Sequence, residues 1–118
     1  MSNASRLQVN TFLRKFKAIV TTGRGLDIIP RPINNETILM LGLTRETVKN
    51  EILGLSVEDY CSGPEPDQDR PGEVWIFGKE INNYDIYIKL KIAVVNQIQI
   101  AKCISFHEAQ YSIKYTFK

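Results

Sequence analysis

The fold is decided by residues 73–107, EVWIFGKEINNYDIYIKLKIAVVNQIQIAKCISFH. In the middle of this stretch, residues 86–92 alternate between apolar side chains and tyrosine or lysine. Because a strand points successive side chains to opposite faces, this pattern predicts a strand with one apolar face and one cationic face. Asparagines at residues 82–83 and within residues 95–97 predict tight turns, since asparagine tolerates a positive φ. We therefore predict a three-stranded antiparallel meander.

The two outer strands of this meander have weaker patterns. In the third run, one phase contains Ile98, Ile100, Ile104 and Phe106, and the other contains Gln99, Cys103, Ser105 and His107. Lys102 falls in the apolar phase, which predicts a bulge or an edge position there. In the first run both phases are apolar, so the sequence leaves its inward face open. We expect helices on the apolar side of the meander and function on its polar side.

The composition is that of a single domain. The chain has 118 residues, of which 43% are hydrophobic and 24% are charged, as in ordinary soluble globular proteins. No apolar run approaches the roughly 20 residues that a membrane-spanning helix needs, so we expect a cytoplasmic protein. Residues 1–4 (MSNA) resemble a partial vector remnant, and the predicted domain covers residues 5–118. The two cysteines lack metal-ligand spacing, and we expect reduced thiols.

The charges are unevenly distributed. The net charge is +2, but residues 1–31 contain six basic side chains and one acidic side chain. Residues 32–72 contain three basic and eight acidic side chains, and residues 73–118 contain six basic and four acidic ones. Two basic segments therefore flank an acidic one. This pattern favours a local cationic patch and a ligand that carries phosphate.

The remaining segments complete an α+β fold. Before the meander we expect a helix over residues 10–20 ended by a left-handed Gly23, then an extended piece at 26–30. A helix from Asn34 or Asn35 to Leu41, a helix capped by Thr44 and a helical turn at Ser56 should follow. We also expect an acidic proline-rich loop over residues 61–72 and a last edge strand over residues 111–117. Apolar stripes on these helices predict that they pack on one face of the C-terminal antiparallel sheet.

The polar face carries side chains suited to phosphodiester chemistry. His107 is the only histidine, and imidazole, with an ordinary pKa of about 6.5, suits proton transfer at neutral pH. In a meander with short turns the last two strands pair, which brings Tyr87 and Lys89 beside His107. Such a group suits binding and cleavage of a phosphodiester. Trp75 and Tyr87 also suit stacking on the bases of single-stranded RNA.

Other interpretations stay open from the sequence. A histidine at a strand end is often incidental, and a basic sheet face is often only solvated. Cys61 together with His107 would form a thiol–imidazole pair. The acidic loop offers three carboxylates to a hard cation: Glu65, Asp67 and Asp69. Their spacing matches no calcium-binding loop, and the alternative is pairing with Arg70 or with backbone N–H groups. We predict no metal and no cofactor.

Four phrases stand in this order along the chain: LGLTRETVKNEILGLSVEDY, VWIFGKE, DIYIKLKI and KCISFHEA. Together they resemble the motility quorum-sensing regulator (MqsR) family of toxins, which belongs to the RelE-like ribonucleases. The resemblance covers residues 7–108. It implies a RelE-like fold and a metal-independent mRNA endoribonuclease (an mRNA interferase). It also implies a type II toxin–antitoxin system, with messenger RNA as substrate and a cognate antitoxin as partner.

The resemblance also assigns roles to residues. The family's functional tyrosine matches Tyr87 in IYIKLKI, and its functional lysine after the SF phrase is His107 here. Where the family has a glutamine after the tryptophan of the strand, this chain has Ile76. Where the family has a lysine after the DFY phrase, this chain has Cys61. Arg70 of the inserted loop is the expected substitute as a phosphate contact.

We therefore predict a site on the polar face of the sheet. The predicted catalytic residues are His107, Tyr87 and Lys89, and the predicted RNA-binding residues are Lys91, Lys79, Arg70 and Trp75. The alternative function is a non-catalytic RNA- or protein-binding module that uses the same basic face.

Overall fold

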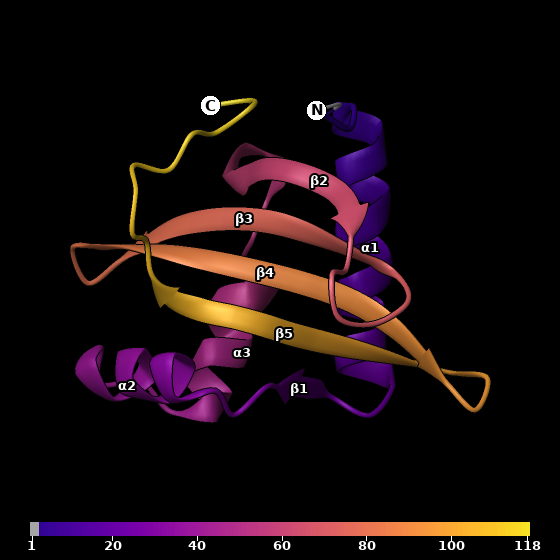
Figure 1. Ribbon diagram of the computed structural model, residues 1–118, viewed down its shortest axis with the longest axis horizontal. Coiled ribbons are helices and arrows are strands. Elements are labelled where there is room, and N and C mark those ends of the chain that lie inside the picture. Colours follow the sequence, from indigo (N-terminus) through magenta and orange to yellow (C-terminus); the bar gives the residue numbers. More distant parts are fainter. Residues whose placement is uncertain (1–2) are drawn as a thin grey trace.

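The structure is a computed structural model that describes residues 3–118. Three helices precede most of a five-stranded sheet (Figure 1). The elements are α1 Arg6–Thr22, β1 Leu26–Ile28, α2 Pro32–Met40, α3 Arg45–Leu53, the 3₁₀ turn η1 Val57–Asp59, β2 Tyr60–Pro66, β3 Glu73–Ile81, β4 Tyr84–Val95 and β5 Ile98–Glu108. The strand order is β1-β5-β4-β3-β2, in which only β1 and β5 pair in parallel. The predicted α+β class and the β3–β4–β5 meander are confirmed.

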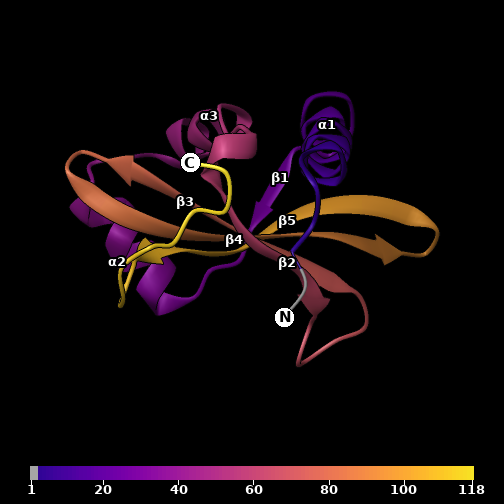
Figure 2. The ribbon, with the colours of Figure 1, turned by 90° about the horizontal axis from the view of Figure 1, so that it is seen from above.

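Helices α1 and α3 cover one face of the sheet, and α2 lies beside its β1–β5 edge (Figure 2). We call the covered face the inner face and the opposite one the outer face. The largest completely buried side chains of the core are Tyr60, Phe16, Phe77, Phe106, Ile28 and Ile52. Among the described residues, no helix combines the length and hydropathy needed to cross a membrane.

Local signals set the ends of the helices. Helix α1 begins earlier than predicted, because Ser5 and Gln8 form a reciprocal capping box. Thr44 caps α3 as predicted. Gly23 ends α1, but the predicted left-handed conformation is wrong, since its φ is −107°. The glycine is needed for space instead: a Cβ atom at this position would lie 2.6 Å from the carbonyl oxygen of Ile19.

Ala4 belongs to the fold, so the prediction that residues 1–4 lie outside the domain is wrong at this position. Its side chain is buried in the core, and its backbone N–H donates to the hydroxyl of Tyr60 at 2.9 Å. Residues 1–2 lie outside the described residues.

Asn34 joins α2 to the edge of β5. Helix α2 begins at Pro32, and Asn34, predicted as its cap, is completely buried inside its first turn. The side-chain amide donates to the carbonyls of Ile29 and Ile104, both at 3.0 Å. Its carbonyl accepts the backbone N–H of Phe106 at 3.0 Å. Asn34 thus supplies the hydrogen bonds that β5 lacks beyond the end of β1.

The predicted bulge lies at Ile104 rather than at Lys102. In β4, residues 89 and 90 pair with Ser105 and Cys103, which leaves Ile104 as the extra residue of β5. A bulge reverses the phase of the alternation, so the predicted faces of the residues before it are wrong. Cys103 is buried in the core on the inner face, whereas Lys102 lies on the outer face.

The predicted loop over residues 61–72 is wrong in its first half. Strand β2 pairs with β3 along this segment, and only residues 67–72 form a loop. The buried Tyr60 fixes the start of β2, and two register shifts let the proline-containing strand follow the edge of β3. Edge strands tolerate such bulges and prolines because one side needs no partner.

The predicted C-terminal strand is also wrong. Residues 109–117, which we call the strap, form no strand and cross the outer face from the end of β5 towards β2 (Figure 1). The N–H of Ala109 donates to the carbonyl of Asp85 at 2.8 Å, and the N–H of Thr116 donates to the carbonyl of Tyr60 at 3.1 Å. Ile113 packs on the backbone of β3 at Gly78, and the ring of Phe117 stacks on Tyr60, so two of the alternating apolar residues bind the strap to the sheet without any strand pairing.

Candidate functional site

The outer face carries the polar side chains of β4 and β5. Tyr87 pairs directly with His107, and Lys89 pairs with Ser105. The residues that alternate with Tyr87 and Lys89 along β4 are buried on the inner face. The predicted grouping of Tyr87, Lys89 and His107 on one face is therefore confirmed.

The rings of Tyr87 and His107 are stacked, with centroids 5.3 Å apart and an angle of 28° between their planes. Nδ1 of His107 lies 3.0 Å from the carbonyl oxygen of Glu108. A carbonyl only accepts hydrogen bonds, so Nδ1 carries the hydrogen, and Nε2 of the neutral ring keeps its lone pair. Burial, with the negative charge of Glu65 adding to it, raises the pKa of Tyr87. The phenol therefore stays protonated at neutral pH and can donate a hydrogen bond.

Arg31 belongs to this group of residues, although the sequence analysis did not select it. Its Nη1 donates to the hydroxyl of Ser105 at 2.9 Å and to the carbonyl of Ile104 at 3.3 Å. Arg31 is the residue before α2, where Pro32 opens the helix. The only sequence signal was the excess of basic residues in the N-terminal segment, because Arg31 and Ser105 are 74 positions apart.

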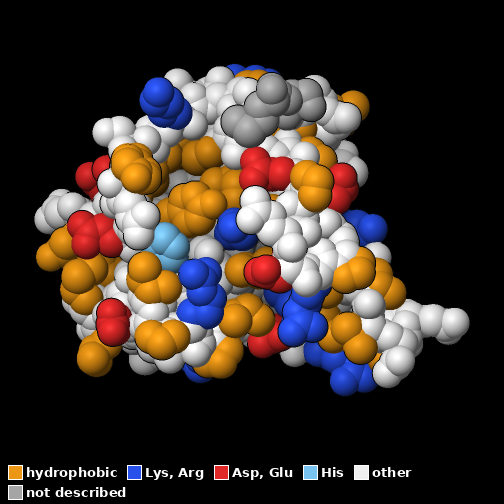
Figure 3. All heavy atoms as spheres, in the orientation of Figure 1, with side chains coloured by type: hydrophobic (Ala, Val, Ile, Leu, Met, Phe, Trp, Pro, Cys, Tyr) orange, Lys and Arg blue, Asp and Glu red, His pale blue; other side chains and the backbone are white. Residues whose placement is uncertain are grey.

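These side chains surround a cleft of about 460 Å³. One wall is the sheet, with Tyr87, Lys89 and His107, and Arg31 stands at its rim. The other wall is the strap, through residues 109–114. Figure 3 looks onto the outer face and shows the histidine surface in the hollow, beside lysine and arginine surface.

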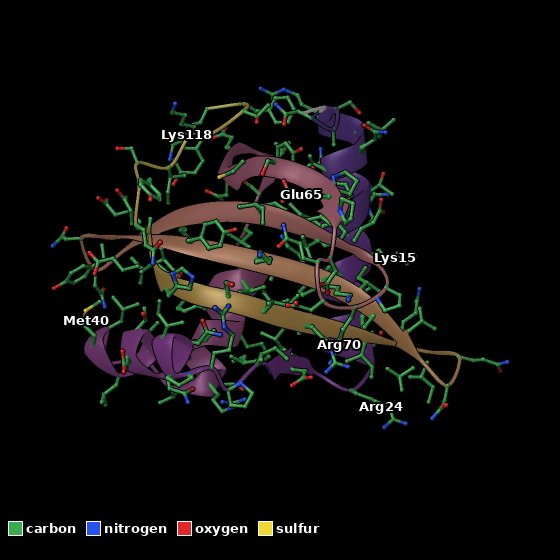
Figure 4. All side chains as sticks on the ribbon, in the orientation of Figure 1. Lys15, Arg24, Met40, Glu65, Arg70 and Lys118 are labelled. Atoms are coloured by element: carbon green, nitrogen blue, oxygen red, sulfur yellow. The ribbon has the colours of Figure 1, made fainter. Side chains whose placement is uncertain are left out.

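A second hollow of about 830 Å³ adjoins the cleft, and Arg31 and Lys89 line both. It lies between the sheet and the loop of residues 67–72. Figure 4 shows Arg70 at the end of this loop, in front of β4 and β5, and Glu65 on β2. Arg70 is exposed and lines this hollow, in keeping with the predicted phosphate contact. The two hollows together form a groove across the outer face.

Trp75 and Lys79 lie on the inner face, so their predicted place in an RNA-binding surface is wrong. The ring of Trp75 stacks on Phe12 of α1, with centroids 4.4 Å apart and 11° between the planes. The ammonium of Lys79 lies 3.0 Å from a carboxylate oxygen of Glu51 in α3. In β3 the outer face is formed by Ile76 and the residues two positions before and after it. The sequence did not reveal this, because both phases of the β3 alternation are apolar.

Lys91 is on the predicted face but is not a free cation. Only 4% of its surface is exposed, and its ammonium lies 2.6 Å from Oδ2 of Asp67. The other carboxylate oxygen of Asp67 accepts the backbone N–H groups of Asp69 and Arg70. The hydrogen bond from Lys91 lowers the pKa of Asp67 to about 2. The pair fastens the 67–72 loop to β4, so Lys91 has a structural role and the predicted phosphate contact is wrong.

Neither cysteine has the properties of a nucleophile. Burial raises the pKa of Cys61 to about 11 and that of Cys103 to about 12, so both remain thiols at neutral pH. Cys61 lines the cleft, but Cys103 lies on the inner face. Among residues 3–118, no three histidine, cysteine, aspartate or glutamate side chains are close enough together to hold a metal ion.

Comparisons of the chain with protein-family models, with curated proteins and with solved structures find no match. The resemblance to MqsR toxins therefore stays a prediction from short phrases.

Proposed function

We propose that this chain is the toxin of a type II toxin–antitoxin pair and cleaves messenger RNA without a metal ion. The observation that carries this proposal is the stacked pair of Tyr87 and His107 in a cleft that also contains Lys89 and Arg31. A proton acceptor, a phenol donor and two cations can together promote transesterification of a phosphodiester, by proton transfer and by stabilising the growing negative charge. The phrases that resemble MqsR toxins support the same function.

The reaction uses a nucleophile from the RNA itself. The ribose 2′-hydroxyl attacks the adjacent phosphorus, the O2′–P bond forms, and the P–O5′ bond breaks. Nε2 of His107 takes the proton of the 2′-hydroxyl, and the departing 5′-oxygen takes a proton from water. The products are a 2′,3′-cyclic phosphate and a free 5′-hydroxyl.

The neighbouring side chains stabilise and orient the reacting phosphate. Lys89 and Arg31 face the charge that grows on the phosphoryl oxygens as the 2′-oxygen attacks, and such charge stabilisation is often the largest catalytic effect. The protonated phenol of Tyr87 donates a hydrogen bond to the same phosphate. The stack with Tyr87 also holds the imidazole in one orientation, which favours transfer of a proton from a bound ribose.

The RNA would lie along the groove formed by the two hollows. Arg70 lines the larger hollow, and its charge favours a neighbouring phosphate. The strap lines one of the two hollows and the 67–72 loop lines the other, so chain segments confine the groove, which suits a single strand. Messenger RNA in the cytoplasm is the proposed substrate, and a cognate antitoxin that covers the groove is the proposed partner.

Inducible expression in bacteria tests this proposal. The wild-type chain should arrest growth and cause decay of messenger RNA, and co-expression of the antitoxin encoded beside it should prevent both effects. His107→Ala should express as a folded protein and cause neither effect. Growth arrest that persists in His107→Ala, without mRNA decay in either strain, would instead support the non-catalytic binding module.

A further inference from the structure

The strap is fastened at both ends and in the middle. Near its start, the N–H of Ala109 donates to a carbonyl of β4. Near its end, the hydroxyl of Thr116 donates to the carbonyl of Cys61 at 2.7 Å, and the ring of Phe117 stacks on Tyr60 with centroids 5.7 Å apart. The guanidinium of Arg6 lies over Phe117, 5.0 Å from the ring centre. These contacts make the strap a fixed part of the domain.

The middle attachment depends on Gly78. A Cβ atom at this position of β3 would lie 2.7 Å from Cγ2 and 2.8 Å from Cδ1 of Ile113. Ile113 therefore packs directly on the β3 backbone, where Gly78 is paired with Tyr87. This contact sets the strap beside the proposed catalytic residues.

Tyr111 stands out on this fixed segment. It lines the same cleft as Tyr87 and His107, yet 86% of its surface is exposed. A large aromatic side chain gains little from the fold when its ring stays in water. An exposed ring at the rim of a cationic cleft is the arrangement with which proteins stack unpaired bases. Lys114, also exposed, lines the cleft from the same segment.

We propose that the strap forms the nucleobase subsite of the cleft, with Tyr111 stacking on the base beside the scissile phosphate. This inference depends on the proposed function and adds the feature of the substrate that the site recognises: an unpaired, unstacked base. Lys114 contacts a phosphate next to that base. Because the strap is attached at three points, the subsite exists before RNA binds.

Binding of short RNA analogues tests the proposal. Labelled hexamers of 2′-O-methyl uridine and 2′-O-methyl adenosine lack the attacking hydroxyl, so their affinity for the intact protein can be measured without cleavage. Replacing each nucleotide in turn by an abasic one should reveal one position at which the wild-type protein loses about 5- to 150-fold in affinity, the effect of one base–aromatic stack. Tyr111→Ala should bind the intact hexamers more weakly by the same factor. In Tyr111→Ala, an abasic nucleotide at that position should cause no further loss of affinity.

Two variants control for changes in structure. Tyr111→Phe keeps the ring and should bind like wild type. Tyr84→Ala removes an exposed tyrosine at the β3–β4 turn, which does not line the cleft, and should also bind like wild type. Suppose that the wild-type protein binds and cleaves RNA, and that Tyr111→Ala keeps both the wild-type affinity and the same loss of affinity for the abasic hexamer. The strap proposal is then overturned, and the proposed function stands. If the wild-type protein binds neither hexamer and cleaves no RNA, the proposed function fails, and the strap proposal fails with it.

Discussion

The ring of Tyr87 in β4 stacks on the ring of His107 in β5, and the two residues are direct partners in the strand register. The stack fixes the plane of the imidazole, while the hydrogen bond from Nδ1 to the Glu108 carbonyl fixes its tautomer. One ring contact and one backbone carbonyl thus determine where Nε2 points. A general base requires this control of position more than it requires a change in its intrinsic basicity.

Substitutions of Tyr87 separate the ring from its hydroxyl. Tyr87→Phe keeps the stack and loses one hydrogen bond to the phosphate, so cleavage should slow by about 10- to 150-fold, the effect of one hydrogen bond to a charged group. Tyr87→Ala also releases the imidazole and should slow cleavage further. Single-turnover rates at saturating RNA measure both effects. Equal rates for the phenylalanine and alanine variants would show that the stack does not position His107.

Lys89→Glu should weaken RNA binding at least tenfold without unfolding the domain. Lys89 lines both hollows and is only partly buried, so reversing its charge opposes the RNA phosphates directly. The slope of log affinity against log salt should also fall by about one. Lys15→Glu is a matched control, because it makes the same change of charge at an exposed position of α1. Equal losses in both variants would mean that only net charge matters.

Trp75, the only tryptophan, is a spectroscopic control for the face assignment. Because it stacks on Phe12 behind the sheet, its fluorescence should change little when RNA binds to the outer face. Trp75→Phe should keep RNA affinity within about twofold, although it should lower the free energy of unfolding, since it removes part of a packed ring. Strong quenching of Trp75 by bound RNA would place the binding surface on the helical side.

The ion pair of Asp67 and Lys91 predicts a loss of stability in acid. The pKa of Asp67 in the folded protein is about 2, below the ordinary value of 3.8 for an aspartate carboxyl group. The pair therefore contributes its full stabilisation above about pH 4 and loses it as the pH falls towards 2. A lowering of the Asp67 pKa by this amount corresponds to about 2 kcal/mol in the free energy of unfolding. The free energy of urea unfolding, measured from pH 6 to pH 2, should decrease accordingly.

Asp67→Asn is the matched variant for that measurement. It should be less stable than wild type at neutral pH, because Lys91 stays buried without its counter-charge. Its stability should also fall less steeply between pH 4 and pH 2. If wild type and Asp67→Asn lose stability in parallel over this range, another carboxylate is responsible. The same pair implies that Lys91→Glu destabilises the domain, so of these two lysines of β4 only Lys89 can be tested as a surface cation.

The central sheet was predictable because its signals are local. The alternation in β4 and the asparagine turns determine the meander, and these turns do adopt positive φ, 52° and 70° at Asn82 and Asn83. Pairing of the last two strands then follows, which brings Tyr87 beside His107. The main elements of the proposed site were therefore accessible from residues 84–108 alone.

The features that differ from the sequence prediction depend on contacts between distant parts of the chain. The bulge at Ile104 depends on Asn34, 70 positions away, which binds the carbonyl of Ile104. The burial of Lys91 depends on a loop that folds back over β4 and provides Asp67. The place of Trp75 depends on which apolar phase of β3 meets α1. None of these contacts has a signature within a short window of sequence.

One measurement tests most directly the claim that His107 is the general base of an RNA-cleaving site. It is the rate at which the purified protein cleaves single-stranded RNA in EDTA, compared between wild type and His107→Ala across a range of pH. Wild type should cleave in EDTA, and its rate should rise with pH, because a general base acts in its unprotonated form. His107→Ala should cleave about 10²–10⁴-fold more slowly, bind RNA with similar affinity, and lose that pH dependence. If His107→Ala cleaves at the wild-type rate with the same pH profile, the histidine takes no part in catalysis. The site proposed here would then be contradicted.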